Sequence, residues 1–458
     1  MTILQIILCI VFLVATGFLV IKKYNPSTVL LFMGLAMLAI SICTGIYSPA
    51  EKFGSTGSVV TDLLNVVEKL FGKTFVGVGF IIMTISGYVG IMNKMKATDA
   101  MVYLASKPLA RFKSNPHLVS VLVLPICTCL FLCINSASGL ALLLMATIYP
   151  ILLNIGVSKP TAMSVIIASL IFDMGPASTN TIIASQCANV DGVDFFIKYQ
   201  IPMVIMAVVV LMIIFYFTNR HFDKKEAAAG KDIYGKADSG AKPDVPLWFA
   251  IFPVLPLLVL ILLSPSVGLV NFKLSTGMAM ILCGLVSVIF LMIYKRSFKA
   301  GCDAMADFFK GMGSSFTSVV VLTVAALVFA EGLMSLNFIG LVVDGCQAVN
   351  MGAAAVTVVF GLVVIFCAAM MGSGNAAFFA FGPMVPTLAT QFGAATVSMI
   401  LPIQLLASMG RGISPISACV VAVCGITGTN TIDLVKRTMI PIVACAVFIL
   451  IANFIFFW

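Results

Sequence analysis

The chain has 458 residues, of which 61% are hydrophobic and 9% are charged, with a formal net charge of +9 and a mean hydropathy of +1.16. This composition excludes a soluble globular protein, in which about a quarter of the residues are usually charged. Many apolar runs are about 17–22 residues long, which suffices to cross about 30 Å of hydrocarbon as helices, and they do not alternate as barrel strands would. The sequence therefore predicts an all-α polytopic membrane protein.

Apolar segments that predict membrane-spanning helices lie on both sides of one polar stretch. They occupy residues 3–21, 28–46, 75–93, 158–190, 199–218, 246–263, 274–294, 314–333, 396–426 and 438–457. Two further stretches, 117–155 and 352–391, are too long for one crossing and are interrupted by small polar residues, which predicts re-entrant hairpins. Residues 97–112 and 298–310 mix charged and apolar residues at helical spacing, which predicts two helices on the membrane surface.

The basic residues are distributed unevenly between the two predicted faces of the membrane. If both hairpins return to the face they entered, most of the 26 Lys and Arg residues gather on one face. The other face keeps only Lys52, Lys69, Lys73, Lys198 and Lys273. By the positive-inside rule, the polar linker 219–245 is cytoplasmic and both termini are periplasmic. The positive charge is thus a topology signal, and no nucleic-acid partner is predicted.

The two halves of the chain repeat a pattern of glycine-broken segments. Ser138-Gly139 is followed by Pro150 and Met174-Gly175, and Ser373-Gly374 is followed by Pro386 and Met409-Gly410, with 36 residues from Ser-Gly to Met-Gly in each case. Residues 1–218 and 246–458 then each form five spanning helices and one re-entrant hairpin. An odd number of crossings turns the second half over, so the sequence predicts two inverted-topology repeats, the pattern of a secondary transporter with a central substrate site.

Each predicted hairpin has a small polar tip. The first tip contains Asn135, Ser136, Ser138 and Gly139, and the second contains Ser373, Gly374 and Asn375. A helix that begins at such a tip points free N–H groups inward and can bind a carboxylate without a buried positive charge. A small-residue packing seam is the alternative interpretation. The occurrence of matched tips in both halves favours binding.

Two further breaks lie inside the predicted spans 158–190 and 396–426. The first break contains Asp173, Ser178, Thr179 and Asn180, and the second contains Arg411 and Ser414. Freed carbonyl groups at membrane depth are tolerated only beside a cavity or protein. Arg411 is the one basic residue predicted deep in the membrane, where a charge usually marks function and where its guanidinium suits a carboxylate. A structural ion pair with Asp173 is the alternative.

Asp173 is the candidate ion-coupling residue. It is expected to balance Arg411, carry a proton or help to hold Na⁺, and the sequence does not choose among these. No resident cofactor or metal is predicted, because the cysteines show no CxxC pair and lie mostly in apolar runs. An enzyme is not predicted, since the spans offer no catalytic set of residues, and a primary pump would need a nucleotide-binding loop.

At these residues the chain resembles the anaerobic C4-dicarboxylate carrier family, the DcuC group, within the wider ion-transporter superfamily. The resemblance covers essentially the whole chain. Its most specific pieces are Ala105-Ser106-Lys107-Pro108-Leu109, Leu143-Leu144-Met145-Ala146-Thr147, Gly372-Ser373-Gly374-Asn375-Ala376, Gly410-Arg411 with Ser414-Pro415, and Val435-Lys436-Arg437-Thr438. One departure is Asn180, where an Asp is expected after the first break.

The resemblance implies exchange or ion-coupled transport of fumarate, malate, aspartate and succinate across a bacterial inner membrane. It also implies a homodimer, a lipid-embedded scaffold and a mobile domain that carries both tips in an elevator motion. The alternative function is a sodium- or proton-coupled carrier of another organic anion, such as a monocarboxylate or an acylated amino acid. A single Arg for two carboxylates keeps this alternative open.

Overall fold

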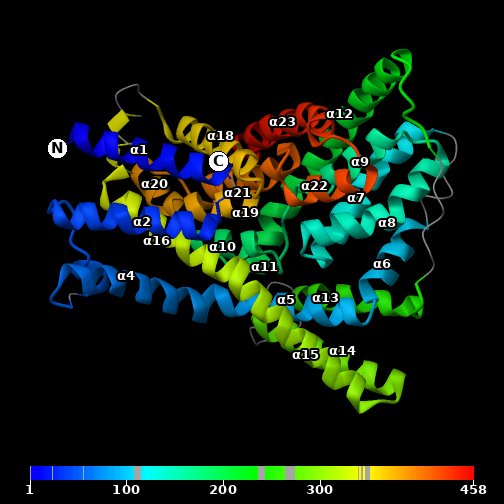
Figure 1. Ribbon diagram of the computed structural model, residues 1–458, viewed down its shortest axis with the longest axis horizontal. Helices are drawn as coiled ribbons and strands as arrows, with labels where there is room; N and C mark the ends of the chain where they lie inside the picture. The colour runs from blue at the N-terminus through cyan, green and yellow to red at the C-terminus, as the bar shows by residue number, and fades with distance from the viewer. Residues whose placement is uncertain are drawn as a thin grey trace.

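The computed structural model describes residues 2–22, 24–54, 56–107, 115–235, 243–263, 274–338, 340–341, 344–345 and 351–458 (Figure 1). Its regular elements in that part of the chain are all helices. Ten helical segments there are long and apolar enough to cross a membrane. The predicted all-α polytopic membrane fold is therefore confirmed, while the inverted orientation of the two halves stays a prediction.

The helices of the first half begin near the N-terminus and end beyond residue 218. They are α1 (Thr2–Ile21), α2 (Pro26–Cys43), α3 (Ala50–Phe53), α4 (Val59–Thr74), the π-helix η1 (Phe75–Gly79), α5 (Phe80–Lys94), α6 (Ala97–Ser106), α7 (Pro116–Cys133), α8 (Ala137–Ile155), α9 (Lys159–Ala168), α10 (Thr179–Cys187), α11 (Gly192–Phe195), the π-helix η3 (Phe196–Gln200) and α12 (Ile201–Ala228).

The helices of the second half follow in a similar order. They are the 3₁₀-helix η4 (Leu247–Val254), α13 (Leu255–Leu262), α14 (Thr276–Lys295), α15 (Phe298–Ser315), the π-helix η5 (Phe316–Val320), α16 (Val321–Ser335), α18 (Ala353–Met371), α19 (Gly374–Phe381), the 3₁₀-turn η6 (Gly382–Met384), α20 (Val385–Phe392), α21 (Thr396–Gly410), the 3₁₀-turn η7 (Arg411–Ile413), α22 (Ala418–Thr427) and α23 (Thr431–Phe456).

Three helical segments are much longer than the sequence patterns predicted. One is Val59–Lys94, formed by α4, η1 and α5, another is Gly192–Ala228, formed by α11, η3 and α12, and the third is Phe298–Ser335, formed by α15, η5 and α16. The predictions of separate spans at 75–93 and 314–333, and of a surface helix at 298–310, were therefore wrong in their boundaries. The polar residues near one end of each segment made it look like a loop and a separate span. In each segment the helix continues through a π-turn, a feature often found at functional sites.

The segments Val59–Lys94 and Phe298–Ser335 both pack against α2 and α14. We call this set of helices the long-helix group; it contains α2, α4, η1, α5, α14, α15, η5 and α16. Within it α2 packs against α16, and α5 packs against α15 and α14. A Cβ atom at Gly34 of α2 would lie only 2.7 Å from the backbone of Val328 in α16. Small residues let backbones approach this closely in membranes.

The remaining core helices, α7–α12 and α18–α23 with their short turns, form the hairpin group. α7 and α8 make one helical hairpin, and α18 followed by α19 and α20 makes another. Residues 169–178 separate α9 from α10, and residues 411–417 separate α21 from α22 apart from the short turn η7. The tips and breaks thus fall where the sequence predicted them. That the hairpins return within the membrane stays a prediction.

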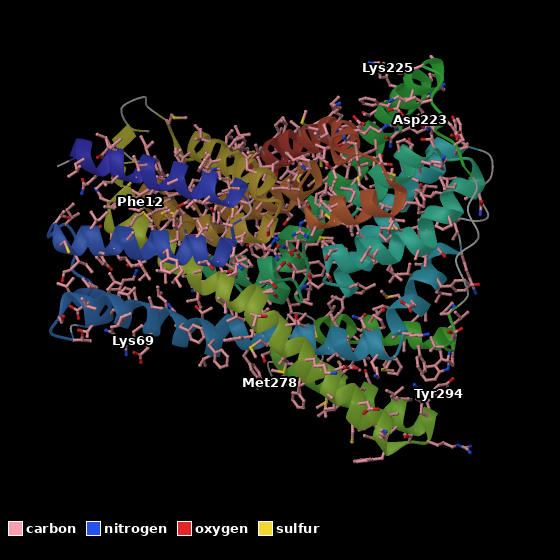
Figure 2. The ribbon with its side chains drawn as sticks, viewed as in Figure 1. Phe12, Lys69, Asp223, Lys225, Met278 and Tyr294 are labelled. Carbon is pink, nitrogen blue, oxygen red and sulfur yellow. The ribbon has the colours of Figure 1, made fainter. Side chains whose placement is uncertain are left out.

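The predicted linker 219–245 begins later than expected. α12 continues to Ala228, with Asn219 and Asp223 buried, so the prediction of an irregular chain from residue 219 was wrong. Asp223 lies far from Lys69, toward the opposite end of the molecule (Figure 2). Residues 236–242 of the predicted linker, and residues 108–112 of the predicted surface helix at 97–112, lie outside the described residues.

Asp223 belongs to a buried charged cluster that joins three helices of the hairpin group. Its Oδ1 lies 2.8 Å from Nη1 of Arg437 in α23, and its Oδ2 accepts a 2.8 Å hydrogen bond from Oγ1 of Thr161 in α9. Nη2 of Arg437 also lies 2.9 Å from Glu226. Arg437 is 2% exposed, so Arg411 is not the only arginine shielded from water. The charge distribution in the sequence predicted Arg437 at the basic face of the membrane.

Candidate substrate-binding site

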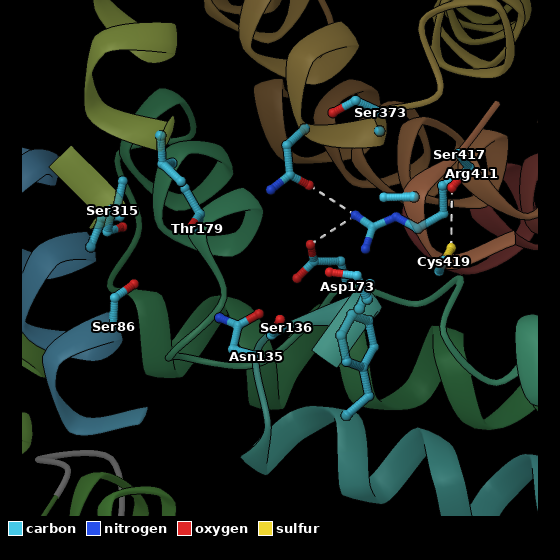
Figure 3. Close-up of a pocket in the computed structure, with 18 of the residues that line it drawn as sticks. Ser86, Asn135, Ser136, Asp173, Thr179, Ser315, Ser373, Arg411, Ser417 and Cys419 are labelled. Atoms are coloured by element: carbon cyan, nitrogen blue, oxygen red, sulfur yellow. Dashed lines mark hydrogen bonds and ion pairs between the residues drawn. The ribbon is translucent and has the colours of Figure 1, made fainter. Parts of the chain in front are cut away.

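A cavity of about 230 Å³ lies between the long-helix group and the hairpin group (Figure 3). The hairpin group contributes both tips and both breaks to it. The long-helix group contributes Ile82, Ile85 and Ser86 of α5, Ser315 of α15 and Val319 of η5. Six segments from different parts of the sequence therefore meet at one small space.

Four helices begin at this cavity, and each begins after a serine. Ser136 precedes α8, Ser178 precedes α10, Ser373 precedes α19 and Ser417 precedes α22. The first three serines accept a hydrogen bond from the backbone N–H three residues later. The serine hydroxyl satisfies one free N–H, and the other unpaired N–H groups and the helix dipole remain available to an anion. The arrangement thus points four positive helix ends at the same space.

Glycine is required at the second tip for two different reasons. Gly372 ends α18 with φ +68°, a conformation that other residues rarely adopt. A Cβ atom at Gly374 would lie 2.5 Å from the carbonyl oxygen of Ala407. The beginning of α19 can therefore rest directly on α21 only while residue 374 is glycine. These contacts fix the second tip beside the break that carries Arg411.

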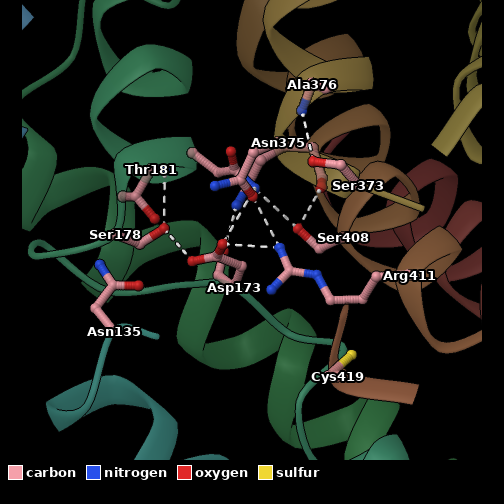
Figure 4. Close-up of polar contacts among 12 residues, drawn as sticks. Asn135, Asp173, Ser178, Thr181, Ser373, Asn375, Ala376, Ser408, Arg411 and Cys419 are labelled. Atoms are coloured by element: carbon pink, nitrogen blue, oxygen red, sulfur yellow. Dashed lines mark hydrogen bonds and ion pairs between the residues drawn. The ribbon is translucent and has the colours of Figure 1, made fainter. Parts of the chain in front are cut away.

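Arg411 is held at the centre of a polar network (Figure 4). Its Nη2 lies 3.0 Å from Oδ2 of Asp173 and donates a 2.8 Å hydrogen bond to Oδ1 of Asn375. Its guanidinium carbon lies 5.9 Å from the ring centre of Phe131. Arg411 is 7% exposed and Asp173 is 4% exposed. The expected pair is thus present, and its two members come from the breaks of different helices.

Ser178 and Asn180 hold the carboxylate of Asp173 from behind the cavity. Ser178 Oγ donates a 2.5 Å hydrogen bond to Oδ1, and Asn180 Nδ2 lies 3.4 Å from Oδ2. The Asn180 amide also donates to Asn375 at 3.2 Å and to Ser408 at 3.1 Å. Asn180 therefore connects the first break to the second tip and to the second broken helix, and it is a supporting residue and not a cavity-lining one.

Two buried glutamines, absent from the sequence prediction, connect the same elements. Gln404 of α21 donates a 2.7 Å hydrogen bond to the carbonyl oxygen of Asp173 and accepts one of 2.9 Å from Gln200. The Gln200 side-chain carbonyl in turn accepts from the backbone N–H of Gly175 at 3.1 Å. Both glutamines are fully buried. Their position inside apolar spans was a usable signal, because uncharged amides in membrane helices usually hydrogen-bond across helices.

The cavity carries no net charge when Asp173 is ionised. Among the described residues that line it, Arg411 is the only cation and Asp173 is the only anion. The remaining polar lining consists of hydroxyl, amide and backbone groups. An anionic ligand would therefore meet helix ends and neutral donors, and it would compete with Asp173 for Arg411.

The structure brings nine of the predicted residues to the cavity, and the other four do not line it. The lining residues are Asn135, Ser136, Ser138, Asp173, Thr179, Ser373, Gly374, Asn375 and Arg411. The others are Gly139, Ser178, Asn180 and Ser414. Ser414 is fully buried, and its hydroxyl has no hydrogen-bond partner among the described residues. The prediction missed the wall made by α5, α15 and η5, and the residues Phe131, Ser417 and Cys419.

The resemblance to known carriers extends over nearly the whole chain. The family model described as C4-dicarboxylate anaerobic carrier, DcuC, matches residues 4–457. The chain is 30% identical to the anaerobic C4-dicarboxylate transporter DcuC of Escherichia coli O6:H1, over 99% of this chain and 97% of that protein. It is 29% identical to the probable anaerobic C4-dicarboxylate transporter DcuC of Vibrio cholerae, over 99% of this chain and 98% of that one.

Two solved transporter structures share the fold. The YdaH transporter of Alcanivorax borkumensis aligns with a TM-score of 0.60 at 14% identity, covering 95% of this chain and 99% of that one. MtrF of Neisseria gonorrhoeae aligns with a TM-score of 0.63 at 14% identity, covering 94% of each chain. At this identity the likeness concerns the fold alone. The whole-length family match and the relatives lead to one conclusion: the chain belongs to the DcuC family of C4-dicarboxylate carriers, which are transporters and not enzymes.

Proposed function

We propose that this protein is a secondary active transporter that moves fumarate, malate, aspartate and succinate across a bacterial inner membrane by exchange or ion coupling. The observation that carries the proposal is the convergence of four helix N-termini and Arg411 on one cavity. Such helix ends bind carboxylates in carriers built from broken helices. The DcuC relatives support a C4-dicarboxylate as the substrate.

The two carboxylates of the substrate would bind at opposite sides of the cavity. Arg411, Asn375 and the backbone N–H groups at the start of α19 would hold one of them. Asn135, Ser136 and Ser138 at the start of α8 would hold the other. This assignment gives each carboxylate one helix end and neutral donors, and it assigns the single arginine to one carboxylate.

Asp173 would couple binding to a second event. Because its carboxylate already occupies Nη2 of Arg411 at 3.0 Å, a substrate carboxylate must displace it or approach from another direction. A proton on Asp173, a Na⁺ ion beside it, or an ammonium group on the substrate would each weaken that competition. Exchange alone would need none of these, since one substrate then replaces another.

An elevator motion would explain why charged and uncharged walls are separated. The hairpin group supplies both charged residues of the cavity lining described here, and the long-helix group supplies only Ile, Val and Ser. A moving hairpin group would keep its ligand contacts while sliding along this uncharged wall. We further propose that the long-helix group forms a homodimer, that the segment after α12 is cytoplasmic and that both termini are periplasmic.

The proposal is tested by counterflow in proteoliposomes loaded with unlabelled succinate, with labelled fumarate outside. Wild-type uptake should require internal succinate, and Arg411→Ala should abolish it while the protein remains folded in size-exclusion chromatography. Lys436→Ala, a change at an exposed residue that does not line the cavity, serves as the matched control. Full uptake by Arg411→Ala would remove this residue from the site.

A second candidate function is sodium- or proton-coupled transport of another organic anion by the same site. The observation that favours it is the single arginine in the described cavity lining, which suits a monoanion as well as one end of a dianion. A substrate panel under imposed Na⁺ and pH gradients distinguishes the two. Uptake of a monocarboxylate or an acylated amino acid, without uptake of succinate or fumarate, would replace the first proposal.

A further inference from the structure

A second cavity, of about 660 Å³, lies between the long-helix group and the second hairpin. Its lining comes from α3, α4, α16 and η6 and includes three lysines, Lys52, Lys69 and Lys73. Glu331 of α16 and Pro383 of η6 also line it. Lys69 lies toward the end of the molecule opposite Asp223 (Figure 2).

The charges at this cavity are not balanced. Glu331 is 3% exposed and is bound by Nζ of Lys52 at 2.5 Å and by the hydroxyl of Tyr47 at 2.7 Å. Lys69 and Lys73 lie one helical turn apart on α4, and neither has an ion-pair partner among the described residues. Three ammonium groups therefore face one carboxylate, which leaves two positive charges.

The predicted topology does not account for this concentration of positive charge. Only five lysines are predicted on this face of the membrane, and three of them line one cavity. Another of the five, Lys198, pairs with Asp194 at 3.2 Å and does not line it. A positive cavity with low-dielectric walls concentrates anions and raises their association rate.

One short helix joins this cavity to the substrate-binding site. The start of α19, at Gly374 and Asn375, lines the central cavity, and η6 directly after its end contributes Pro383 to the lysine cavity. α19 has eight residues and thus spans about 12 Å at 1.5 Å per residue. α19 also packs against α16, which carries Glu331.

We propose that the lysine cavity is an entry site for a small dianion, and that it captures the transported dicarboxylate before the anion reaches Arg411. This inference rests on the proposed function for the identity of the dianion. The two positive charges match the two carboxylates, and the open cavity suits transient binding. Lys69 and Lys73 would contact the anion, while Lys52 remains paired with Glu331.

The first test is transport by the double variant Lys69→Gln/Lys73→Gln. Its apparent KM for succinate should rise about threefold to tenfold at low ionic strength because electrostatic capture is lost, with Vmax unchanged. The salt dependence of the wild-type KM should flatten in the variant. Lys198→Gln, from the same predicted face, should behave as the wild type. An unchanged KM and salt dependence in the double variant would overturn the proposal.

The second test is independent of transport and uses equilibrium dialysis with labelled succinate in detergent. In Arg411→Ala a weak, salt-sensitive binding should persist, and adding the Lys69 and Lys73 changes should remove it. If these lysines bind succinate in this way but the wild-type protein does not transport dicarboxylates, the anion site is supported and the proposed function is rejected. If vesicles of phosphatidylglycerol bind through these lysines and succinate does not, the cavity holds a lipid phosphate and the proposal is wrong.

Discussion

Nη2 of Arg411 and Oδ2 of Asp173 lie 3.0 Å apart, although the residues are 238 positions apart in the sequence. Each residue lies at a break between two short helices, and both breaks face the same cavity. A buried ion pair is a weak source of stability, because removing both charges from water offsets much of their attraction. Its position beside four helix ends is better explained by a role in binding.

Asp173→Asn tests whether the carboxylate competes with the substrate for Arg411. The amide keeps the size of the side chain and removes the charge that competes for Arg411, so we expect succinate to bind about tenfold more tightly to the variant, a gain of about 1.4 kcal/mol. Dependence of uptake on a proton or Na⁺ gradient should disappear. Binding is followed by isothermal titration, and uptake by labelled succinate under each gradient. Weaker binding with intact coupling would show that Asp173 assists the substrate directly.

Arg411→Lys tests the geometry of the cation and not only its charge. Nη2 of Arg411 alone contacts both Asp173 and Asn375, so lysine would lose the remaining guanidinium donors that can form a two-point contact with a substrate carboxylate. We therefore expect dicarboxylate affinity to fall at least about tenfold, by more than 1.4 kcal/mol, with apparent Tm nearly unchanged. Scintillation proximity binding and a thermal-shift assay measure the two quantities. Affinity equal to that of the wild type would show that charge alone suffices.

Gln404→Leu tests the glutamine connection behind the site. The leucine cannot donate to the Asp173 carbonyl oxygen, and it leaves the Gln200 amide without its 2.9 Å partner. An unsatisfied buried polar group costs about 1–3 kcal/mol, so the apparent Tm should fall by several degrees. Gln200→Leu/Gln404→Leu should be less stable than Gln404→Leu alone, because Gln200 also accepts from the backbone N–H of Gly175, which then loses its acceptor. A double variant as stable as the wild type contradicts this account.

Arg437→Met tests the buried charged cluster of Asp223, Arg437 and Glu226 in the hairpin group. Removing the guanidinium leaves the buried Asp223 with two hydroxyl donors and, 3.8 Å away, Nδ1 of His117, and breaking a buried pair in this way typically costs about 3–5 kcal/mol. A large fall in apparent Tm is expected. The neighbouring ion pair of Lys436 with Asp433 is 64% and 58% exposed, so Lys436→Ala should change stability by less than about 1 kcal/mol. Equal effects of the two changes would assign the cluster no special role.

Cysteine labelling tests the predicted orientation in the membrane. Lys225 and Lys69 lie toward opposite ends of the molecule (Figure 2). On a background with the exposed Cys43, Cys129 and Cys302 changed to serine, Lys69→Cys should react with an impermeant maleimide added to whole cells. Lys225→Cys should react only after the membrane is opened. The reverse pattern would invert the proposed topology.

The local breaks of this fold were predictable, and the partners of its polar residues were not. Glycine, proline and serine inside apolar runs indicated the two tips and the two breaks, because such residues end helices wherever they lie in the fold. The place of Asn180 behind Asp173, and the connection between Gln200 and Gln404, depend on how distant helices are packed together. The residue pattern of one helix does not show which side chains of a distant helix will contact it.

The boundaries of the long helices were also not predictable from the sequence. Lys69 and Lys73, in the first half of Val59–Lys94, made this segment look like a polar loop followed by a short span. In the structure the helix continues past both lysines, and they line a cavity. A hydropathy pattern reports the average surroundings of a segment, and it cannot distinguish a loop from a helix that lines a polar space.

If the cavity moves across the membrane as proposed, its neutral charge also determines how the membrane voltage acts on transport. An empty cavity with Arg411 paired to Asp173 carries no net charge across the membrane, whereas a cavity loaded with a dianion carries two negative charges. Each charge moved through the full field is worth about 2.3 kcal/mol per 100 mV. With the cell interior negative, voltage would therefore drive the loaded form outward and leave the return of the empty form unaffected, so an uncoupled carrier of this design would favour excretion of its substrate.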